Sequence, residues 1–502
     1  MTRRDPQLCV VVTGRTMEEL RRARDTVSNA DLVELRLDSV DRPDALGAIE
    51  GRRRPVIVTC RAAWEGGGFA GSEEERERIL SAAEAGGAEF IDVEARAEFV
   101  PAMTRRRSGR GIVISMHVFG EPPADLVDRA RAMRSTGAEI VKIAIEARRL
   151  TDVLTLMDLA GRPELDAPEG SDHVLLAMGQ PGVPSRVLAA RLGNRWTYAG
   201  EEVAPGQMPA SKLLGDFRFR RIRPDAALYG VVGNPIAHSL SPVMHNAGFA
   251  ALGLNAVYVP LQAADADDFV AFARQANVRG ASITAPFKVA MLGKVDEIDP
   301  LARRVGAVNT LVARDGRWIG ANTDVEGFLS PLAGRVALKG TRATVLGAGG
   351  AARAVAIALE TQGAAVTVCA RKEGAAREVA QVAHGSLGTW PPRPGSWDVL
   401  VNATSCGSHT RGDDPMAGVP LDGEIVFDLV YAPAETPLIT RARAEGCLTI
   451  GGIEMLVAQA ERQFELWTGQ RPPAGLFRAV TEAGHHRETA GSAATADKGL
   501  PT

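Results

Sequence analysis

The chain has 502 residues, a length that favours about two to four domains over a single hydrophobic core. Its 45% hydrophobic and 24% charged residues are typical of a globular protein, and a formal net charge of −3 argues against nucleic acid or an anionic membrane as the main partner. The five cysteines form no C-x-x-C pair, which favours reduced thiols over disulfides or a zinc site. No segment has the pattern of a signal peptide or a membrane span, so we expect a soluble, cytoplasmic protein without a bound metal.

The N-terminal part of the chain alternates short apolar runs with longer charged stretches of helical character. Short continuous apolar runs of this kind are typical of buried parallel strands. Eight such units predict a (β/α)₈ barrel, with an open doubly wound sheet as the alternative. The runs are Leu8–Thr13, Leu32–Leu37, Pro55–Cys60, Glu89–Val93, Gly111–Met116, Glu139–Ala144, His173–Met178 and Arg195–Tyr198.

Polar side chains gather at or near the carboxyl ends of these predicted strands. In a barrel, those ends form one face, which is where the active sites of this fold lie, so their shared position favours the barrel over the open sheet. The residues are Glu34, Arg36, Arg61, His117, Lys142 and Arg186.

Lys142 is unusual because it lies inside an apolar strand, Ile140–Ala144. Desolvation there favours the neutral amine, which is the nucleophile that forms a Schiff base with a ketone. The iminium acidifies the neighbouring carbon, and His117 could remove that proton and later protonate a departing hydroxyl. Taken singly, a snorkelling lysine and a satisfied core histidine are the simpler interpretations.

The segment from Cys9 to Gln207 resembles the type I 3-dehydroquinate dehydratases. The resemblance rests on Glu34–Asp38, Thr59–Arg61 with Glu65–Gly67, Ser115–His117, Val141–Ala144, Gly179 with Ser185–Val187, and Ala204–Gln207. It implies that Lys142 is the Schiff-base lysine and His117 the general acid and base. It also implies substrate contacts by Glu34, Arg36, Arg61, Arg186 and Gln207.

Two positions depart from that family's pattern. Val118 follows the histidine where relatives commonly carry Asp or Asn, and Val203 stands where a substrate-contacting serine is often found. Both changes remove hydrogen-bonding capacity. The sequence of this half therefore supports its barrel fold more strongly than it supports catalytic turnover.

The C-terminal half contains a glycine-rich turn between two predicted strands. Gly347, Gly349 and Ala352 occupy G-x-G-x-x-A positions after a strand that ends at Leu346. Such a turn brings the backbone close to a pyrophosphate at a helix N-terminus, although a tight strand–helix turn alone would have the same pattern. After the next strand, Arg371 and Lys372 stand where NAD-binding proteins carry an acidic residue, which favours NADP over NAD.

Further polar motifs surround this turn. Ser239 and Ser241 lie in a turn-rich loop, and Lys288 follows the segment that starts at Thr284. These hydroxyls favour a polyhydroxylated, acidic ligand, and Lys288 and Asp324 are candidates for proton transfer beside a hydride transfer. Individually, each of these residues is equally typical of a turn cap or a solvated surface.

The segment from Tyr229 to about Arg478 resembles the shikimate dehydrogenases over essentially their full length. The matching stretches are Gly233–Pro242, Thr284–Lys288, Gly306–Thr310, Asn322–Asp324, Gly347–Arg353, Asn402–Ser405 and Met455–Gln459. The resemblance implies that Lys288 and Asp324 are the catalytic pair. Ala370 departs from it, because NADP-using relatives often carry Asn there.

The same resemblance implies two sets of contacts. The substrate would be held by Ser239, Ser241, Thr284, Asn309, Asp324, Tyr431 and Gln459. The cofactor would be held by Gly347, Gly349, Gly350, Ala351, Arg371, Lys372, Asn402 and Thr404.

Together these features predict an α/β protein in which a TIM barrel precedes a bilobed unit with a Rossmann domain. We expect a barrel at 1–216, a linker at 217–228, a substrate-binding domain at 229–337 completed by 451–485, a nucleotide domain at 338–450 and a disordered tail at 486–502. The expected activities are dehydration of 3-dehydroquinate and NADPH-dependent reduction of 3-dehydroshikimate. The alternatives are a quinate dehydrogenase, a catalytically degenerate barrel, or a metabolite-sensing regulator without catalysis.

Overall fold

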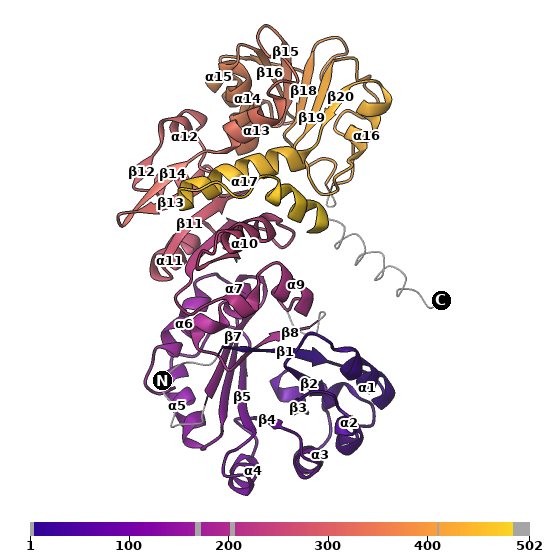
Figure 1. The fold of residues 1–502 in the computed structure, drawn as a ribbon, viewed down its shortest axis with the longest axis vertical. Helices are drawn as coiled ribbons and strands as arrows, with labels where there is room; N and C mark the ends of the chain where they lie inside the picture. The colour runs from indigo at the N-terminus through magenta and orange to yellow at the C-terminus, as the bar shows by residue number, and fades with distance from the viewer. Residues whose placement is uncertain (1–4, 166–171, 201–205, 409–410, 485–502) are drawn as a thin grey trace. The chain divides into compact units, whose positions relative to one another are not determined.

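The structure is a computed structural model that describes residues 5–165, 172–200, 206–408 and 411–484 (Figure 1). It divides into two compact units: the chain up to Ala227 with Pro235–Ala237 and Asn255–Asn277, and the rest of the chain. The predicted tail at 486–502 and the position of Val203 lie outside the described residues. The predicted domain boundaries stay predictions.

The first unit contains a sheet of eight parallel strands in the order β7-β6-β5-β4-β3-β2-β1-β8 (Figure 1). The strands are β1 Gln7–Val12, β2 Leu32–Arg36, β3 Val56–Thr59, β4 Phe90–Glu94, β5 Ile112–Val118, β6 Ile140–Glu146, β7 Asp172–Met178 and β8 Trp196–Ala199. Each one falls on a predicted apolar run, so the barrel prediction is confirmed. The alternative of an open doubly wound sheet is wrong, because β8 pairs with β1 at the start of the series.

A side chain joins the two ends of this sheet. The amide of Asn194 accepts a hydrogen bond from Leu175 N (2.8 Å) and donates one to Leu175 O (2.8 Å). The backbone adds a bond from Arg195 N to His173 O (2.8 Å). Asn194 thereby replaces a stretch of strand pairing between β7 and β8 and brings the barrel close to closure.

The helices of the first unit begin at recognisable caps. Thr16 and Glu19 form a reciprocal capping box at the start of α1, and Ser72 caps α3, whose first turn holds three glutamates. The helices are α1 Met17–Thr26, α2 Ala45–Ile49, α3 Glu73–Ala85, α4 Val100–Arg106, α5 Leu126–Ser135, α6 Asp152–Ala160, α7 Val183–Val187, α8 Ala189–Leu192 and α9 Ala210–Gly215. Short 3₁₀ helices are η1 Leu37–Ser39, η2 Ala63–Glu65, η3 Gln180–Gly182 and η4 Phe219–Arg221.

A mixed sheet follows, with strands in the order β10-β9-β11-β13-β14-β12. Helix α17 packs against α13 and contacts β11 and β13, and Trp467 of α17 donates a hydrogen bond to Leu311 O (2.8 Å). The strands are β9 Ala227–Gly233, β10 Ala256–Gln262, β11 Val278–Ile283, β12 Glu297–Ile298, β13 Thr310–Arg314 and β14 Arg317–Ala321. The helices are α10 Ser241–Ala251, α11 Ala266–Gln275, η5 Ala290–Gly293, α12 Pro300–Val305, α13 Asp324–Leu332 and α17 Gly452–Thr468.

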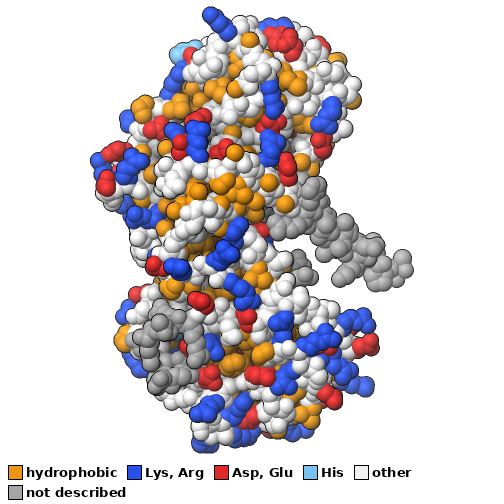
Figure 2. Space-filling model, viewed as in Figure 1, with side chains coloured by type: hydrophobic (Ala, Val, Ile, Leu, Met, Phe, Trp, Pro, Cys, Tyr) orange, Lys and Arg blue, Asp and Glu red, His pale blue; other side chains and the backbone are white. Residues whose placement is uncertain are grey.

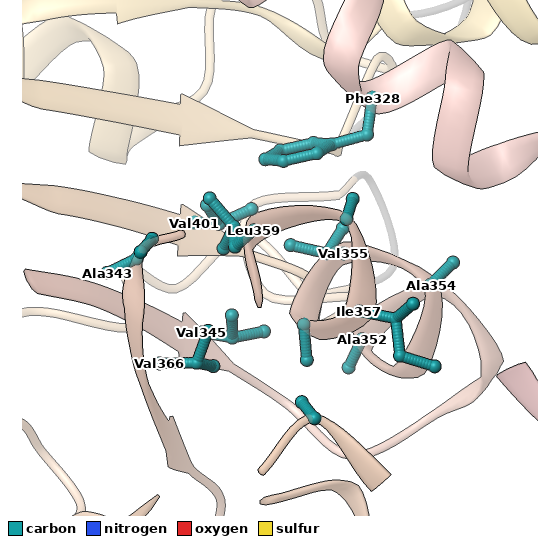
Figure 3. Packing of buried hydrophobic residues seen from close by; sticks show 14 of the residues in the cluster. Phe328, Ala343, Val345, Ala352, Ala354, Val355, Ile357, Leu359, Val366 and Val401 are labelled. Carbon is teal, nitrogen blue, oxygen red and sulfur yellow. The ribbon is translucent and has the colours of Figure 1, made fainter. Parts of the chain in front are cut away.

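The last sheet is parallel, and its order β17-β16-β15-β18-β19-β20 is that of a Rossmann domain. Its core joins strands and helices: Figure 3 shows Val355 of α14, Val401 of β18 and Phe328 of α13 in one apolar cluster. The strands are β15 Arg342–Leu346, β16 Ala365–Cys369, β17 Ser386–Leu387, β18 Val399–Asn402, β19 Ile425–Asp428 and β20 Leu448–Ile450. The helices are α14 Gly350–Thr361, α15 Glu373–Val382 and α16 Pro437–Ala444.

The surface mixes both signs of charge. Figure 2 shows Lys and Arg side chains among Asp and Glu side chains on the visible face. Many surface charges pair locally, as Arg131 does with Asp128 (2.6 Å). In the part of the chain that the structure describes, no helix is long and apolar enough to cross a membrane, and no group of three His, Cys, Asp or Glu residues could hold a metal ion.

Candidate active sites

The barrel contains a cavity of about 170 Å³ that all seven predicted barrel residues line. They come from the ends of different strands and from the loops that follow those strands, as the barrel fold requires. The cavity is lined by Val11, Glu34, Arg36, Arg61, Glu65, Gly66, His117, Phe119, Lys142, Ala144, Leu176, Met178, Arg186, Tyr198 and Gln207.

Lys142 lines this cavity with only 4% of its surface exposed. Its Nζ lies 2.9 Å from Asp92 Oδ2 and 3.4 Å from Glu34 Oε2. Burial opposes ionisation of Asp92, but Arg61 and Lys142 outweigh it and hold the pKa of that carboxyl well below its usual value. The sequence predicts a desolvated amine, and the structure adds two buried carboxylates that pair with it.

His117 is held by a carboxylate from another loop. Glu65 Oε1 accepts a hydrogen bond from the His117 backbone N–H (2.9 Å) and lies 3.0 Å from His117 Nδ1. Burial raises the pKa of Glu65 to about 7. Burial, together with Arg61 and Lys142, lowers the pKa of His117 well below its usual value. The imidazole is therefore neutral near pH 7, as a general base must be.

Arg61 is engaged within the protein as well as lining the cavity. Its guanidinium donates to Asp92 (3.0 Å) and Glu94 (3.0 Å), and both carboxylates are fully buried. Glu94 also binds Arg76 of α3, which is itself fully buried. Negative and positive buried side chains therefore alternate in one network, which holds Arg61 and Asp92 in place beside Lys142.

The remaining predicted cations of the barrel differ in their surroundings. Arg36 binds Asp38 through two hydrogen bonds (2.7 and 2.9 Å), a bidentate arrangement that fixes the guanidinium. Arg186 is 1% exposed, and burial lowers its pKa to about 10. A cation buried at a cavity wall suits the binding of a substrate carboxylate.

In the second unit, Lys288 and Asp324 form a direct ion pair of 2.5 Å between Nζ and Oδ2. Asn309 donates to the other oxygen of Asp324 (2.8 Å) and to Thr323 Oγ1 (3.0 Å). Asp324 is the first residue of α13, where the helix dipole favours a carboxylate. The two predicted catalytic residues and one predicted substrate residue are thus in contact.

The other predicted substrate residues come from several different elements. Ser239 precedes α10 and accepts a hydrogen bond from the backbone N–H of Ser241 (3.3 Å). Thr284 follows β11, and its backbone N–H donates to Val232 O of β9 (2.9 Å). Tyr431 follows β19, and Gln459 lies within α17, where its side chain is almost completely buried.

The glycine-rich turn has the geometry that a nucleotide site needs. Gly347 has φ +115°, and a Cβ there would lie 2.9 Å from Ala403 O, so a side chain is excluded. Helix α14 begins at Gly350 after Gly349, with no side-chain cap on its first N–H groups. A Cβ at Gly350 would lie 3.1 Å from Lys288 Cδ, so the turn adjoins the ion pair.

The cations predicted to select the cofactor follow the neighbouring strand. Arg371 and Lys372 come directly after β16 and Ala370, and both are exposed. An exposed guanidinium and ammonium are available to a phosphate. The uncapped helix start and this cation pair together fit a nicotinamide nucleotide that carries a ribose 2′-phosphate.

Asn402 is fully buried, and its side chain shapes the loop that follows β18. Its Nδ2 donates to Asp428 Oδ1 (2.9 Å) and Cys406 O (3.1 Å), and its Oδ1 accepts from Thr404 N (3.1 Å) and Thr404 Oγ1 (2.7 Å). These bonds engage both ends of the amide. The structure therefore places Asn402 behind Thr404 as a support of the loop.

Comparison with known proteins covers both halves at once. The chain is 34% identical over 485 residues to the chloroplastic bifunctional 3-dehydroquinate dehydratase/shikimate dehydrogenase of Arabidopsis thaliana, a match that spans 89% of this chain and 79% of the relative. The chain belongs to this bifunctional family. Family models match in the same order: type I 3-dehydroquinase at 8–223, shikimate dehydrogenase substrate-binding domain at 231–311 and shikimate 5′-dehydrogenase C-terminal domain at 452–482.

Single-function relatives match the second unit of this bifunctional chain. The NADP(+)-dependent shikimate dehydrogenase of Shouchella clausii is 39% identical over 259 residues, which are 49% of this chain and 94% of the relative. A crystal structure of shikimate 5-dehydrogenase from Thermus thermophilus with NADP(H) and shikimate is 35% identical, with a TM-score of 0.47 over 51% of this chain and 99% of that chain.

Sequence reasoning missed several residues of the two sites in this bifunctional protein. Asp92 had a usable signal, because an acidic residue inside an apolar strand needs a buried partner just as Lys142 does. Glu65 belongs to a motif of the barrel, but nothing local in the sequence indicates that it contacts His117. Asp428, which supports Asn402, ends a strand among apolar residues and carries the same kind of signal as Asp92.

Proposed function

We propose that this chain catalyses two consecutive reactions, with Lys142 and His117 acting in the barrel and Lys288 and Asp324 in the second unit. The barrel converts 3-dehydroquinate to 3-dehydroshikimate by loss of water. The second unit reduces the ketone of 3-dehydroshikimate with NADPH to give shikimate. The observation that carries the proposal is the buried Lys142, paired with Asp92 in the same cavity as His117.

The dehydration begins when Lys142 transfers a proton to Glu34, the other carboxylate beside its Nζ, and attacks the substrate ketone. Loss of water from the adduct gives an iminium, which draws electrons from the neighbouring carbon. His117 removes the proton from that carbon, and the hydroxyl one carbon further leaves as water after taking the proton back from the imidazolium. A water molecule then hydrolyses the product iminium and restores the Lys142 amine.

Substrate orientation in the barrel is assigned to the charged and polar groups that line its cavity. Arg186, buried in the wall, suits the substrate carboxylate. Glu34, Arg36, Arg61 and Gln207 line the same cavity and suit the hydroxyl groups. Glu65 holds the imidazole so that Nδ1 faces the carboxylate and Nε2 is left for the substrate.

In the second unit, NADPH when bound supplies the hydride that reduces the ketone. Gly347 and Gly349 leave room for its pyrophosphate, and Arg371 and Lys372 suit its 2′-phosphate. Lys288 donates the proton that the carbonyl oxygen gains, and Asp324 holds the ammonium in place. The hydroxyl and amide groups of Ser239, Ser241, Thr284, Asn309, Tyr431 and Gln459 are assigned to the substrate.

A spectrophotometric assay tests both reactions. Purified protein is supplied with 3-dehydroquinate and NADPH, or with 3-dehydroshikimate and NADPH, and nicotinamide absorbance is followed. The wild type should consume NADPH from both substrates, Lys142→Ala should lose only the first reaction, and Lys288→Ala should slow both. Lys339→Ala, which removes an exposed lysine, serves as the matched control.

A degenerate barrel is the second candidate, and Val118 is the observation that favours it. It ends β5 beside His117 and offers no hydrogen-bonding group to the cavity. If only 3-dehydroshikimate were reduced, this candidate would replace the first. If neither substrate were reduced although NADPH bound, the metabolite-sensing alternative would apply; oxidation of quinate with NAD would indicate the quinate alternative.

The proposed place of action is the cytoplasm. This stays a prediction: the Arabidopsis relative is chloroplastic, and the described residues contain no helix that could span a membrane.

A further inference from the structure

Tyr198 contacts the reacting nitrogen of the barrel, although no role has been assigned to it so far. It lies in β8, is 3% exposed and lines the same cavity as Lys142. The Lys142 Nζ lies over the face of its ring, 4.5 Å from the centroid. The ammonium also contacts Asp92, at 2.9 Å. The nitrogen is therefore held by both a carboxylate and an aromatic face.

The orientation of the ring is fixed by its neighbours. Trp196 meets Tyr198 edge to face, with centroids 6.5 Å apart and planes at 87°. Phe90 packs in turn against Trp196 at 5.2 Å. Trp196 and Tyr198 belong to the apolar cluster inside the barrel and Phe90 packs against it, so packing holds the Tyr198 face toward Lys142.

An aromatic face and a carboxylate act differently on a positive nitrogen. A carboxylate attracts the cation but also accepts its proton, whereas a ring face attracts the cation through its quadrupole and takes no proton. The attraction is stronger where the partners are desolvated, and both side chains are almost completely buried. Burial also raises the pKa of the Tyr198 hydroxyl well above its usual value, so the phenol stays neutral.

We propose that the face of Tyr198 is a further catalytic contact of the dehydratase reaction, stabilising the positive charge on the Lys142 nitrogen in the Schiff base. The nitrogen of the Schiff base still carries a proton that a carboxylate could remove, and the ring face favours the protonated iminium over the neutral imine. The iminium is the form that acidifies the neighbouring carbon. The hydroxyl of Tyr198 has no part in this role. The inference rests on the proposed assignment of Lys142 as the Schiff-base lysine.

The test compares a variant that keeps the ring with one that removes it. Tyr198→Phe should retain dehydration within about 2-fold, whereas Tyr198→Leu should lower kcat about 10- to 30-fold, the range of a desolvated cation–π contact. Phe90→Leu is the matched control, because it removes an aromatic side chain from the same cluster two rings away from Lys142. Reduction of added 3-dehydroshikimate by each variant reports on the folding of the second unit.

A second readout follows the Schiff base itself. Borohydride reduction in the presence of 3-dehydroquinate should attach the substrate skeleton to Lys142, and mass spectrometry measures the trapped fraction. We expect Tyr198→Leu to trap less than Phe90→Leu under identical conditions. Replacement of Tyr198 by 3,5-difluorophenylalanine keeps the shape but weakens the face, so it should be slower than Tyr198→Phe. This comparison decides the question if the leucine variant does not fold.

The outcomes separate the inference from the function on which it rests. No trapping in the wild type would remove the Lys142 assignment and with it the inference. Trapping in the wild type with equal effects of Tyr198→Leu and Phe90→Leu would overturn the inference alone. A loss in Tyr198→Phe as large as in Tyr198→Leu would also overturn it, by assigning the effect to the hydroxyl.

Discussion

Glu65 holds His117 by two bonds to a single oxygen, from the backbone N–H at 2.9 Å and from Nδ1 at 3.0 Å. Because an ionised carboxylate only accepts hydrogen bonds, this arrangement places the imidazole proton on Nδ1 and leaves the Nε2 lone pair for the substrate. Glu65 is thus a positioning residue whose ionisation state sets the tautomer of the base.

The first prediction concerns the pH dependence of dehydration. Burial raises the pKa of Glu65 to about 7, so the carboxylate form that orients His117 is gained as pH rises through about 7. We expect kcat for 3-dehydroquinate to rise with pH across that range, and Glu65→Gln to lower kcat about 10- to 100-fold and to flatten the rise. A pH–rate profile from about pH 5.5 to about pH 9, which brackets this pKa, measures both effects.

The control for this prediction is Glu74→Gln, which alters an exposed glutamate in the first turn of α3. It should leave the profile unchanged. A Glu65→Gln profile with the wild-type inflection would show that another group controls the pH dependence.

The second prediction concerns the stability of the Rossmann domain. Asp428 is buried, accepts hydrogen bonds from Asn402, Val430 and Thr436, and has its pKa raised by burial to about 6. Its folded pKa exceeds the usual value of 3.8, so the folded state binds the extra proton between these values and loses stability as pH rises through them. Asp428→Asn should remove this pH-dependent loss of unfolding free energy, which is at most about 3 kcal/mol.

Thermal unfolding at about pH 4.5 and about pH 7.5, on either side of the raised pKa, checks this sign. The gain in melting temperature of Asp428→Asn over the wild type should be larger at the higher pH than at the lower one. The wild type loses stability over this range, whereas an amide does not titrate. Asp422→Asn, at an exposed site in the same domain, provides the comparison. An equal change in melting temperature at both pH values would contradict the assigned pKa.

Much of the fold could be predicted from the sequence because its signals are local. The eight barrel strands follow from short apolar runs, and the start of α14 follows from Gly347 and Gly349, whose lack of side chains the turn requires. Barrel closure could not be predicted in the same way. It depends on the Asn194 amide meeting Leu175, a contact between residues 19 positions apart that no periodicity indicates.

The site residues also differ in whether a local sequence signal predicts them. Lys142 could be predicted because a charged residue within an apolar strand conflicts with its surroundings. Its partner Asp92 and its ring contact Tyr198 come from strands distant in the sequence, so their roles depend on the barrel being closed. Glu65 lies in a 3₁₀ helix with no periodic pattern, and only the folded chain brings it to His117.

The third prediction concerns cofactor choice. Arg371 is exposed directly after β16, and a guanidinium binds a phosphate through charge-assisted hydrogen bonds. Arg371→Ala should raise KM for NADPH about 10- to 100-fold and leave KM for NADH nearly unchanged, since NADH lacks the 2′-phosphate. Arg377→Ala, an exposed arginine of α15, is the control. Equal effects on both cofactors would indicate a structural role for Arg371.

The fourth prediction concerns the ion pair of the second unit. Lys288 Nζ lies 2.5 Å from Asp324 Oδ2, while Asn309 donates to Oδ1, so each carboxylate oxygen has its own donor. In Asp324→Asn, the amide oxygen can accept the hydrogen bond from Asn309 only if the amide NH₂ group faces Lys288. That NH₂ group repels the Lys288 ammonium. We expect reduction of 3-dehydroshikimate to slow about 10²- to 10⁴-fold, the usual contribution of a general acid or base.

The same protein supplies its own internal comparison for this variant. Dehydration of 3-dehydroquinate in the barrel, followed without NADPH through the absorbance of the conjugated product, should proceed at the wild-type rate. Glu326→Gln removes an exposed carboxylate from the same helix, and it should leave both reactions unchanged. If Asp324→Asn retained the wild-type rate of reduction, the Lys288 ammonium would be positioned without the carboxylate, and Asp324 would have no role in the reaction.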